Sequence, residues 1–186
     1  MSALICIDMQ RDFLAPESPL CVKEGLACLP HVQKAISNAR AKGLQVFWVK
    51  REHDPSGIDI EWTRKHLIEG GGAGATLPGS QGAEFAEGLL PLPEEHIVVK
   101  KRFSAFFHTH LDLMLRRLSI KSVILCGVQT PNCIRGTAVD ALGLDYEVTV
   151  LSDATASKSS LVQESNLEDM RCMGILTKQV SEWARD

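Results

Sequence analysis

The stretch SVILCGVQTPNCIRGTAVDALGL, residues 122–144, joins an apolar run to a helical pattern. Residues 122–128 are almost continuously apolar, which is typical of a strand covered on both faces. A helix is predicted over residues 131–144, and Pro131 suits its first position. A buried strand that passes directly into a helix is typical of an α/β fold with a parallel sheet.

The same alternation extends along the rest of the chain. An amphipathic helix is predicted over 29–43, and a capping-box-like pair, Thr109 and Asp112, opens another helix over 109–118. Residues 51–95 lose the periodicity and are predicted to form an ordered loop region that could act as a lid. The other predicted elements are strands at 3–7, 44–50, 96–101 and 146–151 and a last helix at about 160–172.

These elements predict an α/β protein, a three-layer αβα sandwich with a mostly parallel, doubly wound sheet. The length of 186 residues fits one domain spanning 1–186. The formal net charge of −3 leaves no basic surplus, so we expect no nucleic acid partner. Neither a signal-peptide pattern nor an apolar run of about eighteen residues is present, so we expect a cytoplasmic protein without a membrane span.

Three residues with useful chemistry lie at or just beyond the carboxyl ends of predicted strands: Asp8, Lys100 and Cys133. With Thr130 as N-cap, Cys133 becomes the third residue of its helix, where free N–H groups and the helix dipole favour a thiolate and can hold an oxyanion. Lys100 supplies a counter-charge and Asp8 a proton carrier. Each residue alone also has an ordinary explanation: packing for the cysteine, a loop cap for the aspartate and solvation for the lysine.

The sequence offers only weak metal or phosphate signals. None of the six cysteines forms a C-x-x-C pair. His108 and His110 are two residues apart and do not share a helix face. His53 and Asp54 are a better pair, although Asp54 precedes turn-forming residues and is suited to initiate that turn. The glycines at 70–74 do not follow a strand, which argues against a phosphate-binding loop.

Three segments resemble, in order, the isochorismatase-like cysteine hydrolase family over roughly residues 3–156. They are ALICIDMQRDFL, VVKKRFSAFFHTHLDLML and VILCGVQTPNCIRGTAVDALGLDYEVTVLSDATA. The surrounding sequence is most similar to the nicotinamidase-related branch. The resemblance implies a catalytic triad of Asp8, Lys100 and Cys133, with Lys101 as the register alternative for the lysine. It also implies a cis peptide between Val128 and Gln129.

The reaction that this resemblance implies is hydrolysis of a small carboxamide or ureido compound through a thioester on Cys133. The oxyanion hole is expected at the turn of Val128, Gln129 and Cys133, with the backbone N–H groups of Gln129 and Cys133 as donors. No cofactor is expected. We expect a small-molecule amide as the partner and, by resemblance, a homo-oligomer, either a dimer or a tetramer.

One departure from the family pattern concerns metal. Nicotinamidases carry an Asp-x-His and a further His after the second strand, whereas this chain reads REHDPSGIDIEW with only His53. Recruiting His66 would require the intervening loop to fold back. We therefore predict no metal site. A metal-assisted nicotinamidase and a catalytically silent small-molecule-binding protein remain the alternatives.

The substrate-binding residues are predicted from their place beside the strand ends. We expect apolar walls and polar contacts to a carboxylate or amide, although core packing or surface solvation is an equally ordinary role for each residue. The apolar candidates are Phe13, Trp62, Phe103 and Phe106, and the polar candidates are Arg51, Arg102, Gln129 and Asn132.

Overall fold

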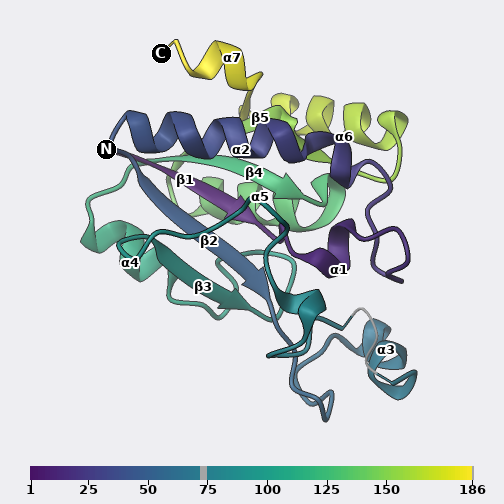
Figure 1. The fold of residues 1–186 in the computed structure, drawn as a ribbon. Coiled ribbons are helices and arrows are strands. Elements are labelled where there is room, and N and C mark those ends of the chain that lie inside the picture. Colours follow the sequence, from purple (N-terminus) through teal and green to yellow (C-terminus); the bar gives the residue numbers. More distant parts are fainter. Residues whose placement is uncertain (72–74, 186) are drawn as a thin grey trace.

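The computed structural model describes residues 1–71 and 75–185, and its centre is one sheet of six parallel strands (Figure 1). The spatial order is β3-β2-β1-β4-β5-β6, so the chain winds outward from β1 in one direction and then in the other. Ligands of such sheets bind where the winding reverses, here beyond the carboxyl ends of β1 and β4. The strands are β1 Ser2–Ile7, β2 Gln45–Arg51, β3 His96–Lys100, β4 Ser122–Val128, β5 Glu147–Ala156 and β6 Leu176–Lys178.

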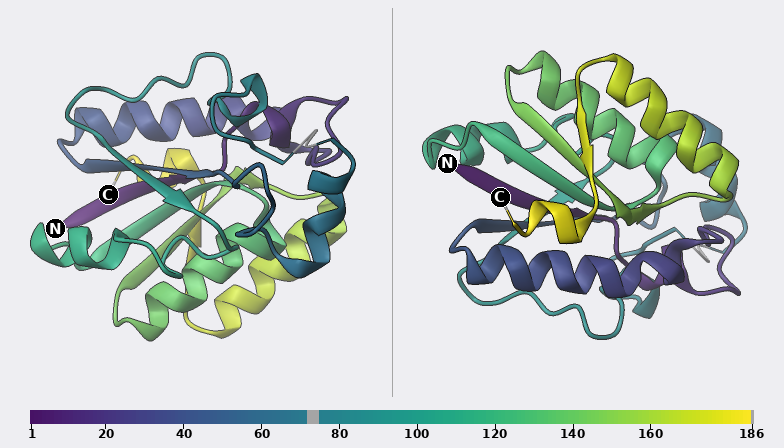
Figure 2. Two further views of the ribbon diagram at one scale, coloured as in Figure 1. Left: turned by 90° about the horizontal axis from the view of Figure 1, so that it is seen from below. Right: turned by 90° about the horizontal axis from the view of Figure 1, so that it is seen from above.

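Helices cover both faces of the sheet (Figure 2), which confirms the predicted three-layer αβα sandwich. Alternate strand residues point to opposite faces: Leu4 and Cys6 pack on the side of α2, while Ile5 and Ile7 pack on the side of α5. One layer holds α2 Gly25–Ala41 and α7 Val180–Trp183; the other holds α4 Leu111–Arg117, α5 Arg135–Gly143 and α6 Ser160–Cys172. None of the described helices combines the length and apolar character needed to cross a membrane.

Short elements gather beyond the carboxyl ends of the strands, where Figure 1 shows α1 and α3. They are α1 Arg11–Leu14, the 3-10 helices η1 Trp62–Arg64 and η2 Gln81–Ala83, α3 Lys65–Glu69 and the π-helical turn η3 Thr130–Ile134. The glycine-rich run predicted at 70–74 lies partly outside the described residues. These elements surround the end of the sheet at which functional groups are expected.

Several predicted boundaries were wrong. The helix predicted from residue 29 begins at Gly25, and β5 continues to Ala156. Thr109 does not cap a helix as part of a capping box: α4 begins at Leu111, whose N–H donates to Thr109 Oγ1 at 3.2 Å. The edge strand β6 and the helix α7 were not predicted, because a strand of three residues and a helix of four carry almost no periodicity.

Gly127 lets β1 and β4 approach each other closely at the end of the sheet. Its φ of +113° lies in a region that other residues rarely adopt, and an added Cβ would lie 2.0 Å from the carbonyl oxygen of Ile7. Glycine is therefore required next to the turn that leads to Cys133.

Candidate active site

Asp8 is the residue that leaves β1. Its backbone N–H donates to the carbonyl of Val49 at 2.9 Å, so the residue is still fixed to the neighbouring strand β2. Its φ of +53° lies in the left-handed region, which is uncommon for a residue with a side chain. Strained residues of this kind cluster at functional sites. The side chain is completely buried, which requires a nearby positive charge.

Lys100, the last residue of β3, supplies that charge. Its Nζ lies 2.7 Å from Asp8 Oδ2 and 3.4 Å from Cys133 Sγ, and it donates to the carbonyl of Arg102 at 3.0 Å. The contact with Asp8 is an ion pair, whereas the contacts with Cys133 and the Arg102 carbonyl are hydrogen bonds. Lys101, the register alternative, instead pairs at 2.7 Å with Asp59 and is 40% exposed. The structure thus brings Lys100 into contact with both Asp8 and Cys133.

Cys133 lies on the π-helical turn that follows β4. The Val128–Gln129 peptide before it is cis, as the resemblance implies. The N-cap is Gln129 rather than Thr130, whose hydroxyl donates to the carbonyl of Ala156 at 3.1 Å, so Cys133 is the fourth helical residue instead of the third. The N–H of Ile134 bonds back five residues to the carbonyl of Gln129 at 3.2 Å, and π turns of this kind recur at functional sites.

The pKa of Cys133 is raised, whereas a position at a helix start was expected to lower it. Burial raises the pKa of the thiol, the Asp8 carboxylate raises it further, and Lys100 and Arg51 offset only part of this. The side chain is 4% exposed, so the positive end of the helix acts in a site with little water. A resting thiol therefore needs a base, and Asp8 is the carboxylate close to it.

Two arginines and an aromatic ring adjoin this cluster. The Arg51 guanidinium is buried, forms an ion pair with Glu61 and lies 5.3 Å from the ring centre of Phe103. The Arg64 guanidinium lies 4.9 Å from the same centre. Both arginines act electrostatically on Cys133.

Arg64 was not among the predicted site residues. It lies in η1, inside the region where periodicity fails, and its spacing gives no indication of where that loop runs. Only its position two residues after Trp62, a predicted binding residue, could have drawn attention to it.

The other predicted binding residues have mixed locations. Phe106 shares a core cluster with Cys133, and its ring centre lies 5.8 Å from that of Tyr146. Asn132 and Phe103 border an open hollow of about 530 Å³. These residues lie on the same side of the sheet as Cys133.

Three of the predicted binding residues make contacts of other kinds. Phe13 packs in the core on the opposite face of the sheet, against the α2 layer. Trp62 is 85% exposed and has the Lys65 ammonium 5.6 Å from its ring centre. The Arg102 guanidinium donates to the carbonyls of Asp59 and Lys101, and the residue also borders the hollow beside Phe103 and Asn132.

The loop after β2 contains the histidine and carboxylates that a metal ion would need as ligands. His53 Nδ1 lies 3.3 Å from Asp59 Oδ1, and His53 Nε2 lies 3.8 Å from Glu61 Oε2. Both carboxylates already have cationic partners, Arg51 on Glu61 and Lys101 on Asp59. A divalent ion would have to compete with these fixed positive charges, so the residues do not fit a metal site. Within residues 1–71 and 75–185, no group of three or more His, Cys, Asp or Glu side chains is placed to hold a metal.

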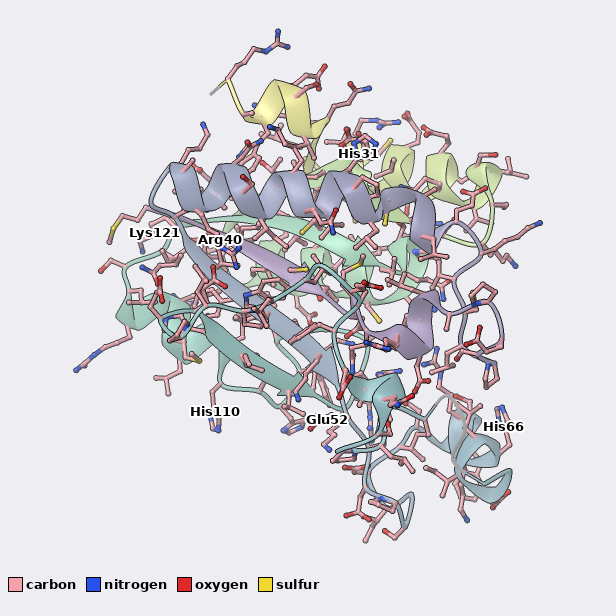
Figure 3. The ribbon with its side chains drawn as sticks, in the orientation of Figure 1. His31, Arg40, Glu52, His66, His110 and Lys121 are labelled. Atoms are coloured by element: carbon pink, nitrogen blue, oxygen red, sulfur yellow. The ribbon has the colours of Figure 1, made fainter. Side chains whose placement is uncertain are left out.

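Other acidic and histidine side chains in or after this loop have partners of their own or lie elsewhere. Asp54 initiates the turn that follows it, because its Oδ1 accepts hydrogen bonds from the backbone N–H and the hydroxyl of Ser56. Glu52 pairs with Lys50 at 2.5 Å. His66 on α3 and His110 directly before α4 lie in separate parts of the molecule (Figure 3).

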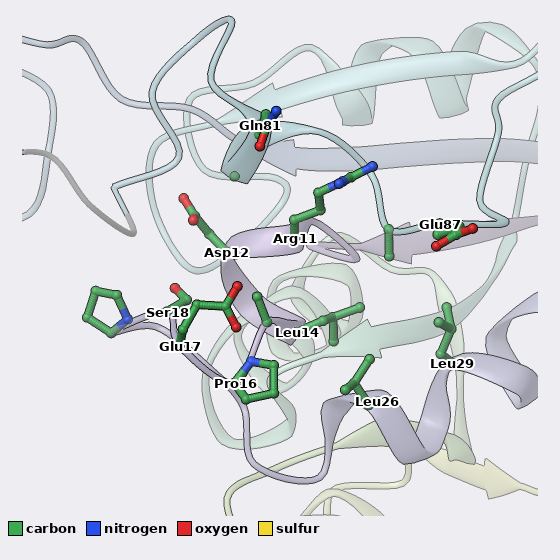
Figure 4. A pocket seen from close by; sticks show the side chains of 14 residues that line it. Arg11, Asp12, Leu14, Pro16, Glu17, Ser18, Leu26, Leu29, Gln81 and Glu87 are labelled. Carbon is green, nitrogen blue, oxygen red and sulfur yellow. The ribbon is translucent and has the colours of Figure 1, made fainter.

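A second hollow, of about 600 Å³, lies between α1, α2 and the segment around η2 (Figure 4). Its lining mixes apolar side chains such as Leu26 and Leu29 with the charged Arg11, Asp12 and Glu87. The lining includes no cysteine, histidine or lysine. The buried Asp8–Lys100–Cys133 cluster, and not this hollow, is therefore the candidate active site.

Known proteins with similar sequences and structures match almost the whole chain. An isochorismatase domain family model matches residues 2–180. A probable inactive nicotinamidase of Arabidopsis thaliana is 41% identical over 187 residues, which span 100% of this chain and 95% of the relative.

Two solved structures extend this similarity to the fold. An isochorismatase family protein from Desulfovibrio vulgaris has 44% identity and a TM-score of 0.94, covering 97% of this chain and 94% of that one. A pyrazinamidase of Pyrococcus horikoshii, solved in complex with zinc, has 33% identity and a TM-score of 0.81, covering 96% of this chain and 98% of that one.

Proposed function

The chain belongs to the isochorismatase family, and on that premise we propose that it is a cysteine-dependent amidohydrolase. The bond cleaved is the C–N amide bond of a small carboxamide or ureido compound. One observation carries the proposal: Lys100 Nζ contacts both Asp8, at 2.7 Å, and Cys133, at 3.4 Å, inside a buried cluster. A nucleophile, a base and a fixed positive charge are the groups that covalent amide hydrolysis needs.

The first step is attack by Cys133 on the substrate carbonyl. Because its pKa is raised, the thiol gives its proton to Asp8 as the C–S bond forms. The carbonyl electrons move to oxygen, and the backbone N–H groups of Gln129 and Cys133 are proposed to hold the oxyanion. Lys100 holds the Asp8 carboxylate and the Cys133 sulfur in position throughout the cycle.

The second half of the cycle releases both products. Asp8 returns its proton to the leaving nitrogen, the C–N bond breaks, ammonia departs and a thioester remains on Cys133. Asp8 then accepts a proton from a water molecule, whose oxygen attacks the thioester. The C–S bond breaks, the acid leaves and the thiol regains its proton.

The test is ammonia release from a panel of carboxamides, ureido acids and carbamoyl compounds by the purified protein. We expect at least one class to be turned over, with nicotinamide among the poor substrates. Absence of ammonia release from every member would contradict the proposal.

The name of the Arabidopsis relative favours a second candidate, a small-molecule-binding protein without turnover. That name concerns nicotinamide hydrolysis and leaves other amides open. The two candidates differ in one observable: a silent protein binds panel compounds without releasing ammonia. The metal-assisted alternative has less support, because Arg51 and Lys101 already neutralise the carboxylates beside His53.

We also propose that the protein acts as a homo-oligomer in the cytoplasm. Exposed apolar side chains that border the same hollow support assembly, since Phe107 is 50% exposed and Val139 is 40% exposed. Light scattering at micromolar concentration measures the mass, and a monomer would contradict this part of the proposal.

A further inference from the structure

We infer that Arg51 and Arg64, which both stack on Phe103 beside Cys133, form a subsite for a carboxylate group of the substrate. The preferred substrates are then amides or ureido compounds that also carry an acid group. The inference rests on the proposed function for the identity of the reacting bond. What it adds is that the rest of the substrate carries an acid group.

Arg51 has donors without acceptors. Only 1% of the side chain is exposed, and Nη2 pairs with Glu61. Within the described chain, its Nε and Nη1 are buried without a hydrogen-bond partner. Burying a donor without an acceptor is costly, and structures seldom retain such groups without a reason. A substrate oxygen at this position would satisfy them.

Arg64 is a second cation with unused donors. Its side chain is half-buried, and its guanidinium makes neither a hydrogen bond nor an ion pair with the residues that the structure describes. Its guanidinium lies over the Phe103 ring and interacts electrostatically with Arg51, Glu61 and the Asp8–Lys100–Cys133 cluster. Two guanidinium groups that share one ring repel each other, so an anion beside both is favoured.

The charges around the cluster do not cancel. Asp8 is paired with Lys100, and Glu61 is paired with Arg51, which leaves the charge of Arg64 uncompensated. Cys133 adds no charge as a resting thiol, and the pKa of His53 is lowered to about 4 by burial and by Arg51, so this ring is neutral at pH 7. Of the two guanidinium groups on Phe103, only Arg64 therefore keeps a charge without a carboxylate partner. One carboxylate would match this charge, whereas a phosphate group would bring close to two negative charges.

The experiment compares acids with their neutral methyl esters. The probes are succinamate, N-carbamoylglycine and the methyl ester of each. Turnover is measured as ammonia release by the otherwise unchanged enzyme, and binding is measured by calorimetry on the Cys133→Ala protein at fixed ionic strength. The test variant is Arg64→Gln. The matched control is Lys65→Gln, which removes the same charge one residue away, from an exposed side chain paired with Glu69.

We expect each acid to bind at least about tenfold more tightly than its ester, the usual effect of one charge-assisted hydrogen bond. The preference should disappear in Arg64→Gln and persist in Lys65→Gln. Equal binding of acid and ester, no measurable binding of the acids, or a preference unchanged by Arg64→Gln would overturn the subsite. Preferential binding of the acids with no ammonia release would support the subsite and contradict the proposed function, so the two failures are distinguishable.

Discussion

Lys100 and Lys101 provide a matched pair for measuring what burial does to an ion pair. Lys100 Nζ and Asp8 Oδ2 are 2.7 Å apart with both side chains 0% exposed. Lys101 Nζ and Asp59 Oδ2 are also 2.7 Å apart, but these side chains are 40% and 26% exposed. The two pairs have the same separation and differ chiefly in their access to water. Lys→Met at each position keeps an apolar side chain of similar length and removes the charge.

Lys100→Met should destabilise the protein by about 3–5 kcal/mol, because it leaves the Asp8 carboxylate buried without its partner. Lys101→Met should cost about 0–1 kcal/mol, because water replaces the lost ammonium at Asp59. The double variant Asp8→Asn/Lys100→Met should recover part of the loss, since no isolated charge is left. Only the Lys101→Met protein should keep its turnover.

Urea unfolding at pH 7 followed by circular dichroism measures these differences, provided that the slopes of the transitions agree among the variants. An unfolding free energy for Lys100→Met within about 1 kcal/mol of that for Lys101→Met would refute the reasoning, because the buried pair would then behave as an exposed one.

Three further predictions concern the thiol, a buried histidine and metal dependence. Because burial and Asp8 raise the pKa of Cys133, iodoacetamide at pH 7 should modify the exposed Cys172 faster; peptide mass spectrometry reads the order, and early labelling of Cys133 would contradict it. The pKa of His53 is lowered from 6.5 to about 4, so the unfolded chain binds more protons between these values and stability should fall as pH drops from about 6.5 to about 4. His53→Asn should flatten that part of the urea-derived stability profile, and an unchanged slope would count against the shift. Exhaustive chelation should leave ammonia release unchanged because Arg51 occupies the carboxylate beside His53; recovery of lost activity only on adding zinc, iron or manganese would place the protein in the metal-assisted class.

The sheet could be predicted from the sequence because its central strands are buried on both faces. Runs such as 3–7 and 122–128 are continuous and apolar, and parallel strands bring their carboxyl ends to one edge. That geometry, together with the resemblance, was enough to nominate Asp8, Lys100 and Cys133. The edge strand β6 was missed because its three residues are all partly or fully exposed.

The electrostatics of the site depend on distances and burial that the sequence does not contain. A helix start predicts a lowered pKa for Cys133, but burial next to Asp8 works in the opposite direction and is stronger. Arg64 reaches the site through an irregular loop whose path is set by tertiary contacts. Trp62 was predicted to bind substrate but is exposed. It lies two positions before Arg64 in the same loop and does not reach the cluster.

The central claim is that Cys133 forms the bond to the substrate, and a pair of cysteine variants tests it most directly. Ammonia release is measured for Cys133→Ala and Cys172→Ala on the best substrate of the panel, with circular dichroism to confirm that both proteins are folded. Covalent catalysis predicts a loss of several orders of magnitude for Cys133→Ala and none for Cys172→Ala, since Cys172 is exposed at the end of α6 and has no part in the proposed reaction. A folded Cys133→Ala protein that releases ammonia at the parent rate would contradict the claim.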